Sequence, residues 1–142
     1  MPQIAPQRNL GRALLVLCVA ILWSFSPAIA VAADSAVVLM YHRFGDSGHP
    51  ENNIQLDQFD AHLDELSKEK YHILPLPEIL SAIKTGKTLP KFTVAITIDD
   101  AFQSVFTRAV PRLKSRGFPF TLFISTRAIE GGSSSYMNWD QI

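Results

Sequence analysis

Short apolar runs alternate along this chain with stretches in which apolar residues recur at helical spacing. The runs at 35–40, 72–74, 92–98 and 118–124 have the length of strands, and they are largely free of charged residues, as expected of strands covered on both faces. Between them, 57–70, 77–86 and 111–116 carry helical patterns. Strands that alternate with helices predict an α/β fold with a parallel sheet or barrel.

Capping and helix-breaking residues set the expected helix bounds. Asp57 is the expected N-cap of the first helix, and Pro77 and Gly86 mark the start and end of the second. Pro111 would interrupt a helix that ran from 102 to 116, so we expect a loop directly after Asp100 and a helix from Pro111 to Arg116. The final stretch, 136–142, predicts an N-cap and first helical turn without a C-terminal signal, which suggests the amino-terminal part of a longer domain.

The first 32 residues have the pattern of a secretory signal peptide. Arg8 and Arg12 precede an apolar core at 13–23, and small residues follow at 26–33. The core is shorter than the ~20 residues of a membrane span, so we expect cleavage rather than a retained anchor. We therefore divide the chain into a signal, 1–32, and one partial domain, 33–142, exported to the periplasm or the extracellular space. Cys18 lies inside the signal, so the remainder can form no internal disulfide.

Charge excludes one class of partner. The whole chain has 13 Lys and Arg against 13 Asp and Glu, and removal of Arg8 and Arg12 leaves the remainder slightly acidic. No basic stripe is present, so we expect no nucleic-acid partner.

Two adjacent carboxylates, Asp99 and Asp100, follow the apolar run at 92–98. Neighbouring ionised carboxylates at the end of a buried strand cost free energy unless a cation or a proton offsets their repulsion. A split role would offset this repulsion, with one carboxylate binding a metal and the other transferring protons. A metal can supply the roughly 12 kcal/mol that it takes to lower the pKa of water from 15.7 to about 7. The alternative is that both residues cap the next segment and start a turn.

A catalytic metal needs about three protein ligands, and the four histidines are too widely spaced to pair on one helix face. His42 leaves the first predicted strand at the same expected rim as Asp99, where it could contact substrate or metal, or simply hydrogen-bond within a loop. We interpret His62 and His72 as structural residues.

The segment 97–101, Thr-Ile-Asp-Asp-Ala, resembles the first motif of the polysaccharide deacetylases, the NodB-type carbohydrate esterases, usually Thr-Phe-Asp-Asp-Gly. Three further segments resemble the same family: Leu-Met-Tyr-His at 39–42 resembles the branch that contains poly-N-acetylglucosamine deacetylases, 117–123 resembles the next strand, and 139–142 resembles the helix before the second motif. Together and in order, these four segments are more specific than the Asp pair alone.

This resemblance implies the amino-terminal part of a distorted (β/α) barrel that hydrolyses N-acetyl groups on a polysaccharide with a divalent metal, most commonly zinc. Asp99 matches the family's catalytic base and Asp100 its metal ligand, while the His-x-x-x-His ligands have no counterpart in this chain, so we expect the isolated chain to be inactive. Two positions depart from the motif, Ile98 for Phe and Ala101 for Gly, and Ala101 would restrict a backbone that needs positive φ.

Two other functions are compatible with parts of the pattern. One is a non-catalytic carbohydrate-binding module on the same fold. The other is a phosphoryl-acceptor domain with a strand-end Asp pair, against which the export signal and the absence of a phosphate-binding glycine loop both argue.

Overall fold

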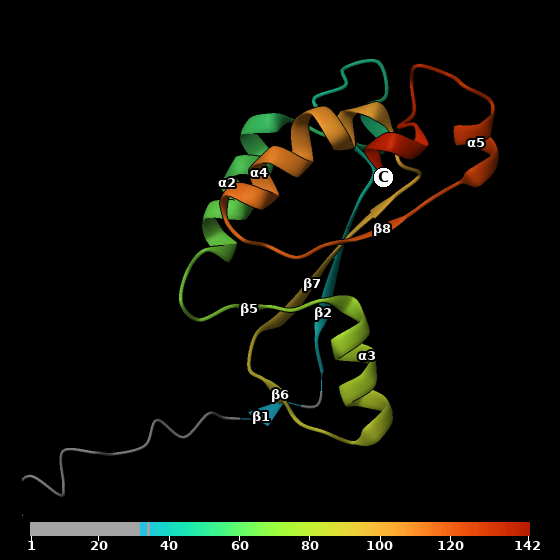
Figure 1. Cartoon of the computed structure of the whole chain (residues 1–142). Coiled ribbons are helices and arrows are strands. Elements are labelled where there is room, and N and C mark those ends of the chain that lie inside the picture. The colour runs from blue at the N-terminus through green and yellow to red at the C-terminus, as the bar shows by residue number, and fades with distance from the viewer. Residues whose placement is uncertain (1–31, 34) are drawn as a thin grey trace, which may run out of the picture. The chain divides into compact units, whose positions relative to one another are not determined.

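The computed structural model describes residues 32–33 and 35–142, which belong to one compact unit (Figure 1). The predicted signal peptide and Cys18 fall outside this range, apart from residue 32. Among the described residues, no helix has the length and hydropathy needed to cross a membrane.

A parallel sheet organises the molecule around one strand, β7 (Thr93–Asp99). Strand β2 (Val37–Tyr41) pairs with β7 along its length on one side, with Tyr41 opposite Ile98. On the other side, β5 (His72–Ile73) pairs with the beginning of β7 and β8 (Thr121–Phe123) with its end. The predicted α/β class with parallel strands is confirmed. Three of the four strands, β2, β5 and β8, are shorter than the apolar runs that predicted them.

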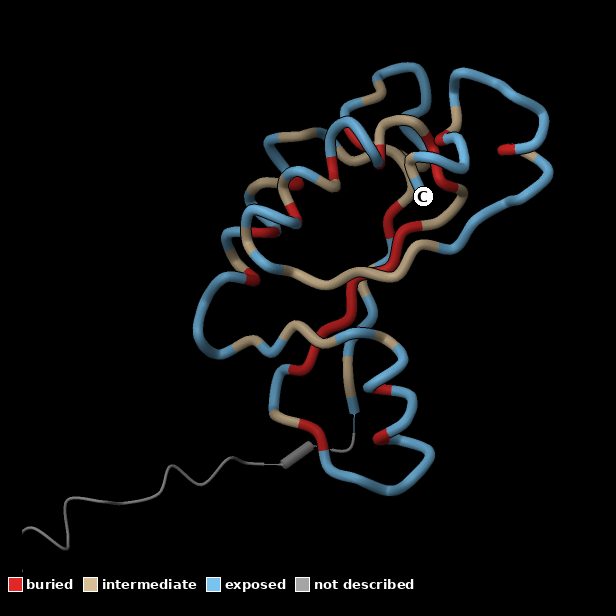
Figure 2. Tube along the Cα trace, in the orientation of Figure 1, coloured by how far each residue is buried: buried red, intermediate tan, exposed pale blue. Residues whose placement is uncertain are grey.

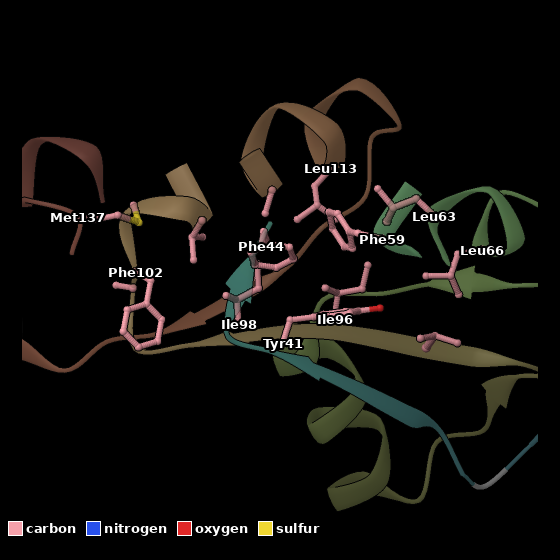
Figure 3. Packing of buried hydrophobic residues seen from close by; sticks show 14 of the residues in the cluster. Tyr41, Phe44, Phe59, Leu63, Leu66, Ile96, Ile98, Phe102, Leu113 and Met137 are labelled. Atoms are coloured by element: carbon pink, nitrogen blue, oxygen red, sulfur yellow. The ribbon is translucent and has the colours of Figure 1, made fainter. Parts of the chain in front are cut away.

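The two faces of β7 are covered by different elements. Figure 2 shows β7 as a nearly continuous buried stretch, and only its last residue, Asp99, is partly exposed. Val94, Ile96 and Ile98 point to the main core, which helices α2 (Leu56–Leu66) and α4 (Val110–Ser115) cover (Figures 1 and 3). On the opposite face, Ala95 packs against helix α3 (Leu76–Thr85).

Aromatic side chains fill the main core between β2 and α2. The ring of Phe44 lies 4.7 Å from that of Phe59, and the Tyr41 ring lies 5.3 Å from Phe59 (Figure 3). Phe59 and Leu63 come from the apolar face of α2 and are fully buried. Burial of such side chains contributes about 1.5–3 kcal/mol each, so this cluster fixes the end of β2 against the helix layer.

The segment after the Asp pair differs from our expectation. Instead of a loop up to Pro111, the chain is helical from 103 onward, with a π-helical turn, Val105–Ala109 (η2), that runs directly into α4. In this wider turn the Val110 N–H donates to the Val105 carbonyl, five residues back. Because Pro111 has no N–H and its ring crowds the preceding turn, a π turn accommodates it without ending the helix.

The start of α2 also differs from the prediction. Its N-cap is Gln55, not Asp57, and the Gln58 side chain accepts a hydrogen bond from the Gln55 N–H at 3.3 Å. Asp57 lies in the first turn, where its negative charge interacts favourably with the positive end of the helix dipole. The end of α3 is confirmed: Gly86 follows it with φ 67°.

Several short elements were not predicted. They are β1 (Ala32–Ala33) paired with β6 (Leu89–Pro90), β3 (Arg43–Phe44) paired with β4 (Asn53–Ile54), the turn η1 (Pro50–Asn52), and helix α5 (Thr126–Glu130). The expected first helical turn near the end is present as η3 (Trp139–Gln141), and its N-cap Asn138 accepts a hydrogen bond from the Gln141 N–H.

Candidate active site

Asp99 and Asp100 lie where the central strand ends. Asp99 is the last residue of β7, opposite Phe123 of β8. The Asp100 N–H donates to the Phe123 carbonyl at 2.9 Å, so the neighbouring strand still holds the backbone of the second carboxylate. Both carboxylates are therefore carried by the carboxyl end of a parallel sheet, where chemistry in α/β folds collects.

The turn after the strand adopts a backbone conformation that side chains with a Cβ rarely take. Asp100 has φ 71° and Ala101 has φ 52°. Left-handed conformation costs an L-residue about 1–2 kcal/mol, and such strain persists only where the surroundings enforce it. Here the Met137 N–H donates to the Ala101 carbonyl at 2.8 Å, and the Gln103 N–H donates to the Ser135 carbonyl at 2.8 Å. The segment 133–137 thus holds the turn that aims the two carboxylates.

His42 is brought to the same rim. Its Nε2 lies 3.9 Å from Oδ2 of Asp99, and both side chains are about a quarter exposed, at 26% and 29%. At this distance a protonated His42 forms an ion pair with Asp99, and a neutral one lies within reach of a bridging water. The proximity of these two side chains agrees with the expectation that β2 and β7 end at one edge.

Arg43 joins the segment after β2 to the turn after β7. Its guanidinium carbon lies 3.6 Å above the centre of the Phe102 ring, and its NH1 donates to Oδ2 of Asp46 at 2.9 Å. Close by, the Phe44 N–H donates to the Ser104 hydroxyl at 3.2 Å. A cation over an aromatic face contributes about 0.5–2 kcal/mol, so these contacts hold His42 and Asp99 in a fixed relation.

The turn after Asp100 is not a free loop. Ala101, Phe102 and Val105 are buried in the main core. The π turn has Ser104 as its N-cap, so neither carboxylate is the N-cap of that turn. The alternative that the Asp pair caps the next segment and starts a turn is thus confirmed in one part and wrong in the other: the chain does turn at Asp100 and Ala101, but the Asp pair does not provide the N-cap of the π turn.

The remaining histidines lie away from this edge or are engaged elsewhere. Nδ1 of His62 lies 3.0 Å from the Tyr41 hydroxyl, in hydrogen-bond contact, which fits a structural role. His72 is exposed at the start of β5, and Nδ1 of His49 lies 3.5 Å from Glu51.

The described residues do not form a complete metal site on their own. Within 32–33 and 35–142, no three His, Cys, Asp or Glu side chains are grouped so that they could hold an ion. A catalytic zinc site needs about three protein ligands. Asp100 has suitable oxygen ligands but lacks enough described partners.

A polar pocket opens beside His42, and no sequence pattern predicted it. It has a volume of about 280 Å³ and includes Met40, His42 and Arg43 from one segment and Glu51, Asn52 and Asn53 from another. The two segments meet because β3 and β4 pair, with Arg43 opposite Asn53. Two-residue strands have no periodicity to detect, which is why the pocket could not be predicted.

Comparisons with known proteins identify relatives of the chain. No family model matches it. Poly-β-1,6-N-acetyl-D-glucosamine N-deacetylases of Staphylococcus aureus strains MSSA476 and N315 are each 31% identical over 123 residues, which cover 77% of this chain and 41% of theirs. The chain thus spans less than half the length of these curated relatives.

Solved structures give the same result for the fold. The Streptococcus pyogenes deacetylase PplD, in complex with acetate, aligns with TM-score 0.66 and 26% identity over 79% of this chain and 50% of its own. IcaB from Ammonifex degensii aligns with TM-score 0.64 and 30% identity over 77% of this chain and 47% of its own. The predicted resemblance and the predicted fold are confirmed. The chain is a homologue of the polysaccharide N-deacetylases, and its fold matches about half the length of each of these two deacetylase chains.

Proposed function

We propose that this chain takes part in the hydrolysis of N-acetyl groups on an exported or cell-surface polysaccharide, with a divalent metal. One observation carries the proposal: the Asp pair stands on a strained turn at the carboxyl end of β7, with His42 beside it. The relation to N-deacetylases selects this chemistry among the reactions that paired carboxylates can support.

Different roles are proposed for the two carboxylates. Asp99 is the base that takes a proton from the water attacking the acetyl carbon, after which the C–N bond breaks to give acetate and a free amine. Asp100 is one ligand of the metal, for which we propose zinc. When bound, this ion would polarise the acetyl carbonyl oxygen. The described residues supply too few ligands for a complete site, so the remaining ligands are not assigned.

We propose that His42 orients Asp99 or contacts the substrate at the rim. The contact with Asp99, 3.9 Å, supports this role because a base must be held in one orientation to act on a single water.

We also propose export to the periplasm or the extracellular space through a signal at 1–32, followed by a partial deacetylase domain at 33–142. An N-acetylated polysaccharide outside the cell requires such a route.

The chain and a chimera together test the function. The chimera adds, after residue 142, the segment of a Staphylococcus aureus relative that follows its aligned part. We expect the chain alone to bind zinc weakly and to release no acetate from β-1,6-linked N-acetyl-D-glucosamine oligomers, and we expect the folded chimera to release acetate. In the chimera, Asp99→Asn should keep zinc but lose turnover, and Asp100→Asn should lose zinc.

The matched control is Asp57→Asn, on the exposed first turn of α2, which should change neither zinc content nor turnover. Equal zinc and acetate values in all variants would contradict the assigned roles. A folded chimera that binds the oligomers but releases no acetate, with or without zinc, would instead favour the carbohydrate-binding module.

A further inference from the structure

The polar pocket beside His42 has hydrogen-bonding capacity that the described residues leave unused. Two buried side-chain atoms in the described part of the chain have no hydrogen-bond partner, Nε of Arg43 and Oδ1 of Asn52, and both residues line this pocket. Native structures leave few such atoms, and each calls for a physical explanation. Asn53, the next residue, is satisfied: its Oδ1 accepts from the Asp46 N–H at 2.8 Å.

The Asn52 amide can turn toward a ligand at little cost. Its terminal torsion has a broad energy profile, and rotation breaks no hydrogen bond of Oδ1 because none is made. The Asn53 amide, in contrast, is fixed by its bond to the loop backbone. Asn52, together with Nε of Arg43, is thus available for recognition in this pocket.

The charges around the pocket select an uncharged ligand. Arg43 is paired with Asp46 at 2.9 Å, and Glu51 adds a carboxylate to the lining, so a phosphate, sulfate or carboxylate would meet no unpaired Lys or Arg there. The groups that remain are the Asn52 amide, the His42 ring and the apolar side chain of Met40, which is 62% exposed. Hydroxyl groups for the amide and the imidazole, and a C–H face for Met40, are features of a neutral sugar ring.

We infer that this pocket binds a neutral sugar residue of the polysaccharide, next to the residue whose acetyl group faces Asp99. The inference rests on the proposed function, and it places a second point of substrate attachment on the segment 50–53. His42 belongs to both places, because it lines the pocket and contacts Asp99. A polymer held at the pocket would lead directly to the carboxylate rim.

Binding of β-1,6-linked N-acetyl-D-glucosamine oligomers to the full 142-residue chain tests this inference without any turnover. Backbone NMR shifts on titration should map to 40–43 and 50–54. Asn52→Leu should weaken binding about tenfold, the value of one lost hydrogen bond in a desolvated site. Its Tm should stay unchanged or rise, because the substitution also removes an unpaired buried oxygen. Asn52→Ala serves as a second variant with less bulk.

The control is Asn138→Leu, which makes the same change in a different polar pocket, lined in part by Gln103, Ser133 and Gln141, and which also removes the N-cap bond of η3, so its Tm is measured beside its affinity. Its affinity for the oligomer should equal that of the unmodified chain. The inference would be overturned by absence of binding at millimolar oligomer, or by NMR shifts that map to the Asn138 pocket. Equal affinity of the unmodified chain, Asn52→Leu and Asn138→Leu would also overturn it. Each of these results is distinct from a failed deacetylase, which is scored separately by acetate release from the chimera.

Discussion

Ala101 combines a left-handed backbone, φ 52°, with a fully buried side chain. Glycine would remove the steric cost of about 1–2 kcal/mol, but it would also lose a buried methyl group and make the unfolded chain more flexible. Alanine at this position is therefore a compromise between backbone strain and packing. The fold tolerates it because hydrogen bonds from the segment 133–137 hold the turn.

Substitutions at Ala101 should show this balance. We expect Ala101→Gly to change the free energy of unfolding by less than about 1 kcal/mol, because the gains and losses nearly cancel. Ala101→Val should lower it by about 3 kcal/mol, since a β-branched side chain is disfavoured at positive φ and overpacks the core. Urea denaturation monitored by circular dichroism measures both. Equal stability of the Val and Gly variants would contradict the left-handed assignment.

Tyr41 gives the stability a dependence on pH in the alkaline range. Burial raises the pKa of its phenol above the ordinary value of 10.0. The unfolded chain therefore loses this proton at a lower pH than the folded chain. The contribution of the protonated phenol to the free energy of unfolding is complete below pH 10 and is lost as the pH rises through the pKa of the folded state. The phenol ring itself packs on Phe59 and contacts His62 through its hydroxyl.

We expect the free energy of unfolding to fall above pH 10 more steeply in the unmodified chain than in Tyr41→Phe. Below that pH the variant should be less stable by about 1 kcal/mol, the value of a hydrogen bond. Urea titrations of both proteins between pH 8 and pH 11 isolate this contribution, because other groups titrate equally in the two. A constant difference across the range would contradict the raised pKa.

Helix termini show how far local signals determine an element. Gly86 ends α3 with φ 67°, and an added Cβ there would meet no atom within 4 Å, so a substitution would be strained only by its backbone. Gly131 follows α5 with an ordinary right-handed φ of −66°. Substitutions at these two glycines therefore test whether the cost of a side chain comes from a left-handed backbone or only from the position after a helix.

We expect Gly86→Ala to lower the free energy of unfolding by about 1 kcal/mol through left-handed strain. The matched Gly131→Ala should lower it by less, because alanine suits that conformation and restricts the unfolded chain, and its only cost is a Cβ that would lie 3.3 Å from the Arg127 carbonyl oxygen. Thermal unfolding by calorimetry compares both variants with the unmodified protein. Equal losses would mean that contacts, and not φ, set the cost at Gly86.

Elements with a strong periodic signal were predictable, and those fixed by neighbours were not. The apolar run of β7 and the glycine stop of α3 are local features, so the sequence was sufficient for both. Pro111 is also local, yet its effect depends on the buried Val105 and Leu113, which anchor a π turn to the core. Such tertiary anchoring overrides the usual helix-breaking role of proline.

At the scale of the whole molecule, the site was predictable in part. The Asp pair could be assigned to a strand end because the preceding run is apolar, and His42 to the same edge because parallel strands align their carboxyl ends. The contact of Arg43 with Phe102 and the pocket formed by β3 and β4 depend on residues far apart in sequence or on two-residue strands. No composition or spacing signal marks those contacts.

The sheet also presents an exposed apolar face beside Asp99. Register places Val38 beside Ala95, Met40 beside Thr97, and Phe123 beside Asp99, so these side chains share one face. Val38, Met40 and Phe123 are 49%, 62% and 51% exposed. Several exposed apolar groups on one sheet face bind apolar ligands more readily than a single exposed residue does.

We therefore expect the protein to bind the dye ANS in its folded state and Met40→Gln/Phe123→Gln to reduce the fluorescence of the bound dye. The control is Ile83→Gln on α3, a residue that is 53% exposed and does not belong to this sheet face, which should leave the dye signal unchanged. Because all three side chains are about half exposed, neither protein should lose more than about 1 kcal/mol of stability. Fluorescence titration together with urea denaturation separates dye binding to the folded sheet from binding to loosened molecules. An equal loss of signal in the control would place the dye elsewhere and remove the case for a continuous apolar face.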